Sequence, residues 1–107
     1  MEKEKLETKW YHYLTAFFAG IFFTNMLPHY IHGISGKEFP TPFADPPGVG
    51  LSSPTMNVVW ALINFFIGTS LLYFGKLGSR KKSLWIAGVV GAVVMSFYVA
   101  HYFGTRI

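Results

Sequence analysis

Three long stretches of this sequence contain no charged side chain, and they constrain the fold more than any other feature. They cover residues 10–36, 46–75 and 83–105. Roughly 20 helical residues cross the apolar core of a bilayer, which is about 30 Å thick, so each stretch can span a membrane. We therefore predict an all-α membrane protein, a single domain over residues 1–107 with three transmembrane helices near residues 10–33, 57–75 and 83–104.

Composition argues against a water-soluble fold. Apolar residues make up 51% of the chain and charged residues 13%, about half the usual charged share. A soluble three-helix bundle needs a polar face on each helix, and these stretches have too few polar residues to supply one. The chain also has no cysteine, which excludes disulfides, thiolate metal sites and a cysteine nucleophile.

The distribution of basic residues predicts the orientation. The segment 76–82 carries four basic residues and no acid, and short loops rich in Lys and Arg stay in the cytoplasm. With three spans the N-terminus is then also cytoplasmic, whereas the loop 34–56 and the C-terminus are extracytoplasmic. Seven Lys and Arg residues fall on the cytoplasmic side and two, Lys37 and Arg106, on the other side. Because the basic residues lie at helix ends, the formal charge of +4 predicts no nucleic-acid binding.

The loop 34–56 is rich in Gly, Pro and Ser. Loops of this length without secondary structure are usually either functional or disordered. Four closely spaced prolines restrict this one to extended conformations, and the side chains of Phe39 and Phe43 favour burial. We predict an ordered extracytoplasmic loop that covers the helix ends, with Phe39 and Phe43 as anchors. Ser53 should cap the next helix, with Pro54 at its first position.

Three of the four histidines fall on the extracytoplasmic side: His29, His32 and His101. Histidine and carboxylate suit zinc or copper, so these three residues, with Asp45 or Glu38 as a further ligand, are candidates for a metal site. A b-type haem between a histidine of the first helix and His101 is a second interpretation. A third is that the histidines bond lipid phosphate, water or loop carbonyls, and proton or quinone chemistry is a fourth. The cofactor, a metal ion or haem, stays open.

Small residues recur at intervals of four on the first and third predicted helices. The two stripes consist of Ala16, Gly20 and Thr24, and of Gly88, Ala92, Ser96 and Ala100. Such stripes let helix backbones approach closely in lipid. We therefore predict that these two helices pack along their stripes, or that one stripe contacts a second subunit.

Asparagines supply polar contacts between the predicted helices. Asn57 and Asn64 share an inward face of the second helix with Ala61 and Gly68. Asn64 lies at about the depth of Asn25, so we predict a hydrogen bond between these two amides, worth about 1 kcal/mol. On the first helix, helical spacing places Asn25 on one stripe with His29 and His32.

The runs PHYIHGISG, FPTPFADPPG and SSPTMNVVW stand at residues 28–36, 39–48 and 52–60. In these runs the chain resembles small bacterial integral membrane proteins of no established activity. The resemblance covers about residues 20–70 of the sequence. It implies a location in the bacterial inner (cytoplasmic) membrane, and it implies no catalytic or binding residues.

No enzyme class is predicted, because the sequence has no glycine-rich phosphate loop, serine elbow or pair of acids with catalytic spacing. We expect an accessory subunit of a membrane complex or a homo-oligomer that acts by helix–helix association. Its expected partners are the lipid bilayer and other membrane subunits or further copies of the chain. The alternatives are a membrane metal or haem protein that uses the extracytoplasmic histidines, and a small transporter formed on oligomerisation.

Overall fold

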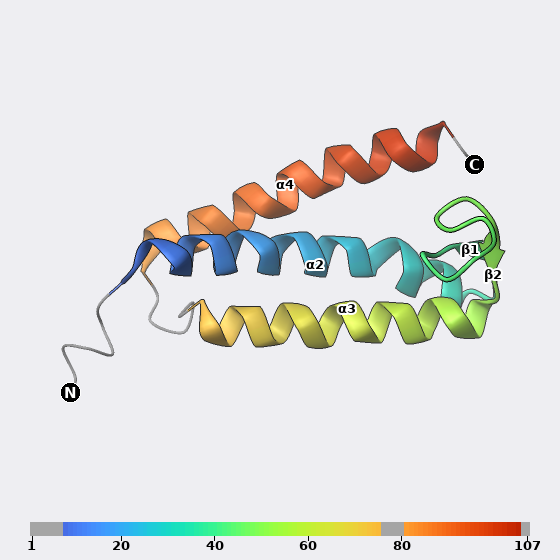
Figure 1. Ribbon diagram of the computed structural model, residues 1–107, viewed down its shortest axis with the longest axis horizontal. Coiled ribbons are helices and arrows are strands. Elements are labelled where there is room, and N and C mark those ends of the chain that lie inside the picture. Colours follow the sequence, from blue (N-terminus) through green and yellow to red (C-terminus); the bar gives the residue numbers. More distant parts are fainter. Residues whose placement is uncertain (1–7, 76–80, 106–107) are drawn as a thin grey trace.

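The computed structural model describes residues 8–75 and 81–105. Within them the chain forms five elements, namely helix α2 (Trp10–Ile34), strand β1 (Phe39–Pro40), strand β2 (Leu51–Ser52), helix α3 (Pro54–Phe74) and helix α4 (Lys82–Gly104) (Figure 1). All three helices are long and apolar enough to cross a membrane, so the predicted helical architecture is confirmed. Five basic residues that contribute to the predicted orientation lie outside the described residues: Lys3, Lys5, Lys76, Arg80 and Arg106.

Helix α2 lies between the other two helices, and each of them packs against it (Figure 1). Helix α3 runs antiparallel along α2, whereas α4 runs in the same direction as α2 and diverges from it toward its own C-terminal end. The strands β1 and β2 pair antiparallel, with Phe39 opposite Ser52 and Pro40 opposite Leu51. This hairpin lies where α2 ends and α3 begins, and we call this part of the molecule the loop end.

Residues at every third or fourth position hold α3 against α2. All four members of the predicted inward face are buried: Asn57, Ala61, Asn64 and Gly68. At Gly68 the absence of a side chain lets an aromatic ring approach, because a Cβ there would lie only 3.1 Å from the ring of Phe23. The predicted inward face of α3 is therefore confirmed.

Glycines bring the backbones of α2 and α4 into contact away from the loop end. A Cβ on Gly20 would lie 2.0 Å from the carbonyl oxygen of Gly88, and a Cβ on Gly91 would lie 2.0 Å from the carbonyl oxygen of Phe17. No side chain larger than a hydrogen atom fits at either position. The fully buried side chain of Leu84 lies near this contact and belongs to the small apolar core between the two helices.

The predicted small-residue stripes meet along only part of their length. Where the glycines touch, Ala16 and Gly20 lie against Gly88 and Ala92, as predicted. Thr24 is half-buried beside an apolar pocket between α2 and α4. Ser96 and Ala100, by contrast, are exposed. For these two residues the predicted packing of the two helices is wrong, because α4 diverges from α2 toward its C-terminal end (Figure 1). Contact of this part of the stripe with a second subunit stays a prediction.

Helix α3 starts with the predicted cap. The hydroxyl oxygen of Ser53 accepts a hydrogen bond from the backbone N–H of Met56 over 3.1 Å, and Pro54 is the first helical residue. Such a cap satisfies one of the N–H groups that a helix leaves free in its first turn. The helix therefore begins at Pro54, as the cap predicts, three residues before the predicted transmembrane span near 57–75.

Only one of the two predicted loop anchors is buried. Phe39 in β1 is 3% exposed and its ring lies against the helices. Phe43 is 56% exposed, although its ring centre lies 5.1 Å from that of Trp60. The prediction of burial is wrong for Phe43, which lies beyond β1 in a turn.

Candidate functional site

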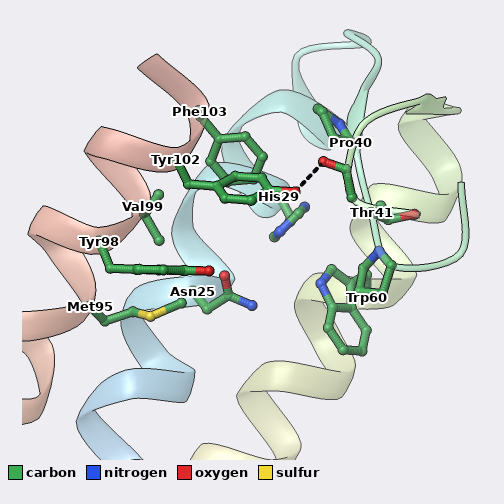
Figure 2. Close-up of a pocket in the computed structure, with 12 residues that line it drawn as sticks. Asn25, His29, Pro40, Thr41, Trp60, Met95, Tyr98, Val99, Tyr102 and Phe103 are labelled. Atoms are coloured by element: carbon green, nitrogen blue, oxygen red, sulfur yellow. Dashed lines mark hydrogen bonds between the residues drawn. The ribbon is translucent and has the colours of Figure 1, made fainter. Parts of the chain in front are cut away.

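A pocket of about 190 Å³ lies at the loop end, between α2, α4 and the loop (Figure 2). Its walls come from every element of this part of the chain except β2. Twelve residues line it: Asn25, His29, Pro40, Thr41, Pro42, Gly48, Trp60, Met95, Tyr98, Val99, Tyr102 and Phe103. None of the twelve is an Asp, Glu, Lys or Arg, so the pocket is polar at a few points and carries no fixed charge.

Asn57 of α3 is the centre of the hydrogen bonds behind this pocket, and its side chain is fully buried. Its amide nitrogen donates toward the carbonyl oxygens of Phe39 at 2.9 Å, Ser53 at 3.1 Å and Ser52 at 3.2 Å. Backbone carbonyls can only accept, so they fix which way the amide points. The side-chain oxygen of Asn57 then faces Nδ1 of His29, 2.8 Å away.

This contact determines the tautomer of His29. The Asn57 oxygen can only accept, so Nδ1 of His29 carries the hydrogen and Nε2 of the neutral ring is an acceptor. The side chain is 3% exposed, and in the described part of the chain Nε2 has no hydrogen-bond partner. In that same part, no side-chain nitrogen or oxygen is both buried and unpaired. Nε2 is therefore open to the pocket that His29 lines.

A second series of hydrogen bonds ends at Asn25. The amide nitrogen of Asn64 donates to the carbonyl oxygen of Trp60 over 2.8 Å, which leaves the Asn64 oxygen as an acceptor. The amide nitrogen of Asn25 donates to that oxygen over 3.1 Å, so the predicted bond between the two amides is present. The remaining oxygen of Asn25 is an acceptor on the pocket wall, and in Figure 2 it points into the pocket.

The two hydrogen-bond series end on the same face of α2. Asn25 and His29 are separated by four residues, which places their Cβ atoms about 5–6 Å apart on neighbouring turns. Each of them presents an acceptor whose direction is set by backbone carbonyls of α3 or the loop. The pocket therefore offers two oriented acceptors without any nearby charge.

Four aromatic side chains, from α3 and α4, form another part of the wall (Figure 2). The hydroxyl group of Tyr102 donates to the carbonyl oxygen of Gly48 over 2.9 Å and so ties α4 to the loop. The hydroxyl of Tyr98 and the indole N–H of Trp60 have no hydrogen-bond partner among the described residues. Both groups can donate a hydrogen bond to a molecule in the pocket.

The structure does not gather the predicted metal ligands. Among the described residues, no three His, Asp or Glu side chains lie close enough to hold one metal ion. His32 bonds through Nδ1 to the carbonyl oxygen of Pro28 at 2.7 Å, and its ring stacks on Phe39 with centres 4.0 Å apart. Three other candidates are exposed: Glu38, Asp45 and His101. His101, the other predicted haem ligand, is also not among the residues that line the pocket with His29.

Sequence reasoning did not single out Thr41, which is 1% exposed and organises the loop. Its carbonyl oxygen accepts hydrogen bonds from the backbone N–H groups of Ala44 at 3.1 Å and Gly48 at 2.8 Å. Its hydroxyl group bonds to that of Ser52 at 2.5 Å. A signal was available, because Thr41 stands between two prolines and is the residue of this segment whose side chain can form a hydrogen bond.

The aromatic residues of α4 that line the pocket also went unrecognised. Tyr98 and Tyr102 are separated by four residues and therefore lie on one face of α4, where their rings stack with centres 6.0 Å apart. Tyrosines at the end of an apolar helix are usually interfacial belt residues. Hydropathy alone could not show that this face turns toward α2 and the loop.

Comparison of the chain with models of protein families, with curated proteins and with solved structures found no match. The class of protein is therefore defined by its fold and site alone. The fold has three helices apolar enough to span a membrane, with paired polar groups between them, and the site is an uncharged pocket at one end of the helices.

Proposed function

We propose that this chain is an integral membrane protein of the bacterial inner membrane that works by helix–helix association. It acts as an accessory subunit of a membrane complex or as a homo-oligomer. It crosses the bilayer three times, with its N-terminus in the cytoplasm and the loop 34–56 and the C-terminus outside. The observation that carries this proposal is the second half of α4, where the small residues Ser96 and Ala100 are exposed.

The distribution of polar and apolar side chains supports insertion into a bilayer. In the described part of the chain, the buried hydrophobic residues are few: Ala16, Ala19, Phe39, Ala61 and Leu84. Polar residues are buried in equal number: His12, His29, Thr41, Asn57 and Asn64. Large apolar side chains stand outside, such as Phe66 at 73% exposure and Phe97 at 74%. This arrangement is unfavourable in water but suits lipid, where polar groups must pair inside and apolar groups face hydrocarbon.

The described basic residues support the proposed orientation. Lys9 stands before α2, and Lys81 and Lys82 stand at the start of α4, so all three lie at the end opposite the loop (Figure 1). Lys37 lies in the loop. The excess of positive charge at the end opposite the loop favours a cytoplasmic location for that end.

The path of α4 supports association. This helix packs closely against α2 near Gly88 and Gly91 and then diverges from it (Figure 1). The exposed Ser96 satisfies its own hydroxyl group by donating to the carbonyl oxygen of Ala92 over 2.7 Å. It can therefore face another apolar helix without leaving an unpaired group, and its small size lets that helix approach closely.

Cysteine crosslinking in native membranes tests the association. The chain has no native cysteine, so Ser96→Cys supplies one thiol at a known position. We expect this variant to form a crosslinked dimer or an adduct with another membrane protein. Phe97→Cys is the matched control, since Phe97 is 74% exposed on the neighbouring face of α4. Monomer alone from Ser96→Cys, or equal yields from both variants, would contradict the proposal.

Thiol labelling tests the orientation independently. Asp45 is an exposed residue of the loop. A membrane-impermeant maleimide should label Asp45→Cys in spheroplasts with an intact inner membrane. Labelling that requires disruption of this membrane would place the loop in the cytoplasm and reverse the topology.

A further inference from the structure

We propose that the pocket at the loop end binds a membrane-soluble hydroxylated aromatic molecule, a phenol or hydroquinone, through a hydroxyl group that donates to Nε2 of His29. In a hydroquinone, the second hydroxyl group can donate to the side-chain oxygen of Asn25. This binding is separate from the association proposed above, because the pocket lies between elements of one chain and does not include Ser96 or Ala100. Either proposal can fail without the other.

The unpaired acceptors on the pocket wall call for a ligand that donates hydrogen bonds. The side chain of His29 is only 3% exposed, and its Nδ1–H donates to the oxygen of Asn57. Its Nε2 has no hydrogen-bond partner among the described residues. The oxygen of Asn25 is left over in the same way once its amide nitrogen has bonded to Asn64. Both acceptors face one pocket and are unpaired within the described part of the chain, so a donor in the pocket would satisfy both of them.

A hydroxyl group fits these groups better than a carbonyl or a cation does. A quinone carbonyl only accepts, so it would leave both acceptors unpaired. A cation would need a counter-charge, and the lining contains no Asp or Glu. A hydroxyl group donates and accepts, so it can bond to Nε2 and also accept from the free N–H of Trp60.

The walls and the surroundings indicate an aromatic ring with access from lipid. Four aromatic side chains stand among the lining residues: Trp60, Tyr98, Tyr102 and Phe103. The volume of about 190 Å³ exceeds the space of about 150 Å³ that is known to accept benzene. Met95 and Val99 add apolar lining on α4, which diverges from α2 at this end (Figure 1). Tyr98 lines the pocket and is also 57% exposed, so the pocket reaches the outer surface of α4 and a ligand dissolved in the membrane can enter there.

Fluorescence of Trp60 measures the binding directly. The variant Trp10→Phe/Trp85→Phe leaves Trp60 as the remaining tryptophan of the chain, and it serves as the parent for the following measurements in detergent micelles or nanodiscs. The probe is a decyl-substituted hydroquinone under nitrogen. It is compared with its oxidised quinone and with its dimethyl ether, which keeps the ring and tail but has no hydroxyl hydrogen.

We expect saturable quenching by the hydroquinone, with affinity about tenfold higher than that of the quinone or the ether, since a site built for a hydroxyl group rejects analogues that lack it. A hydroquinone without the decyl tail should bind more weakly if the ligand comes from the membrane. If the hydroquinone without the tail binds as tightly as the one with it, recognition of the ring is still supported, and the ligand is assigned to the aqueous phase. Equal affinities for hydroquinone, quinone and ether, or no saturable quenching by any of them, would overturn the proposal.

Two variants separate binding from folding. His29→Phe keeps a ring but removes the acceptor and should abolish the preference for hydroquinone, although loss of the bond to Asn57 can also disturb the fold. Val99→Phe leaves both hydrogen-bond series intact and fills the pocket from α4, so it should abolish quenching. Val93→Phe on the same helix is the matched control, because Val93 is 48% exposed and does not line the pocket. Unchanged quenching in Val99→Phe would overturn the proposed site.

Discussion

Nδ1 of His29 lies 2.8 Å from the side-chain oxygen of Asn57, and neither side chain is more than 3% exposed. The bond joins α2 to the first turns of α3. The amide nitrogen of Asn57 extends the link to the carbonyl oxygen of Phe39 in β1, 2.9 Å away. Through Asn57, therefore, two helices and the loop hold one another in place.

Replacing Asn57 with Leu should strongly destabilise the protein. Leucine is similar in size but cannot hydrogen-bond, so the N–H of His29 and the carbonyl oxygen of Phe39 lose their partner. We expect the free energy of unfolding in micelles to fall by about 3 kcal/mol. Denaturant titration followed by circular dichroism measures it. Met56→Leu, at an exposed neighbouring position, is the control. A loss below about 0.5 kcal/mol in Asn57→Leu would show that these bonds add little stability.

A single methyl group should separate α4 from α2. In Gly91→Ala the new Cβ would lie 2.0 Å from the carbonyl oxygen of Phe17, so the helices must move apart. Overpacking of this kind costs about 1–3 kcal/mol. Gly104→Ala is the matched control on the same helix, because nothing lies within 4 Å of a Cβ at Gly104. Thermal unfolding should show a lower midpoint for Gly91→Ala only, and equal midpoints would contradict the close contact.

The bond between Asn25 and Asn64 can be measured with a double-mutant cycle. The single changes to Ala and the double change are compared by the same unfolding assay. Asn64→Ala also removes the bond to the carbonyl oxygen of Trp60, so its own effect should be the larger of the two. We expect a coupling energy of about 0.6–1.7 kcal/mol, the range found for polar pairs between membrane helices. Strictly additive effects would mean that the two amides do not interact.

Two loop glycines with the same backbone conformation offer a test of the contact between α4 and the loop. Gly36 and Gly48 both have φ near +73°, where alanine costs about 1 kcal/mol. A Cβ on Gly36 meets nothing within 4 Å, whereas one on Gly48 would lie 2.7 Å from the hydroxyl oxygen of Tyr102. Gly48→Ala should therefore destabilise the protein more than Gly36→Ala.

The extra cost at Gly48 should depend on the tyrosine hydroxyl. In a Tyr102→Phe background that oxygen is gone, and the nearest remaining ring atom lies 3.8 Å from the added Cβ. The two alanine changes should then cost about the same in the unfolding assay. If the difference between them persists in this background, the proximity of Tyr102 to Gly48 is not its cause.

Some of the site could be predicted because helical periodicity decides which side chains share a face. A spacing of three and four residues predicts the inward face of α3, and the similar depth of Asn25 and Asn64 predicts the bond between them. The cap at Ser53 depends only on the next few residues. The arrangement of the candidate metal ligands could not be predicted in this way. His32 turns to the carbonyl oxygen of Pro28 in its own helix, and His101 lies on a face of α4 that the sequence does not orient.

The sequence by itself determined three apolar helices, their order and the signals at their ends, because these depend on residues close together in the chain. Tertiary structure alone decided that α4 leaves α2 beyond Ala92, that Phe39 is buried while Phe43 is not, and that two acceptors of α2 face one pocket. These features depend on the crossing of helices and the path of the loop. The crossing angle and the loop path are set by contacts between residues far apart in the sequence. Examples are the contact of Gly91 with Phe17 and the hydrogen bond of Tyr102 with Gly48.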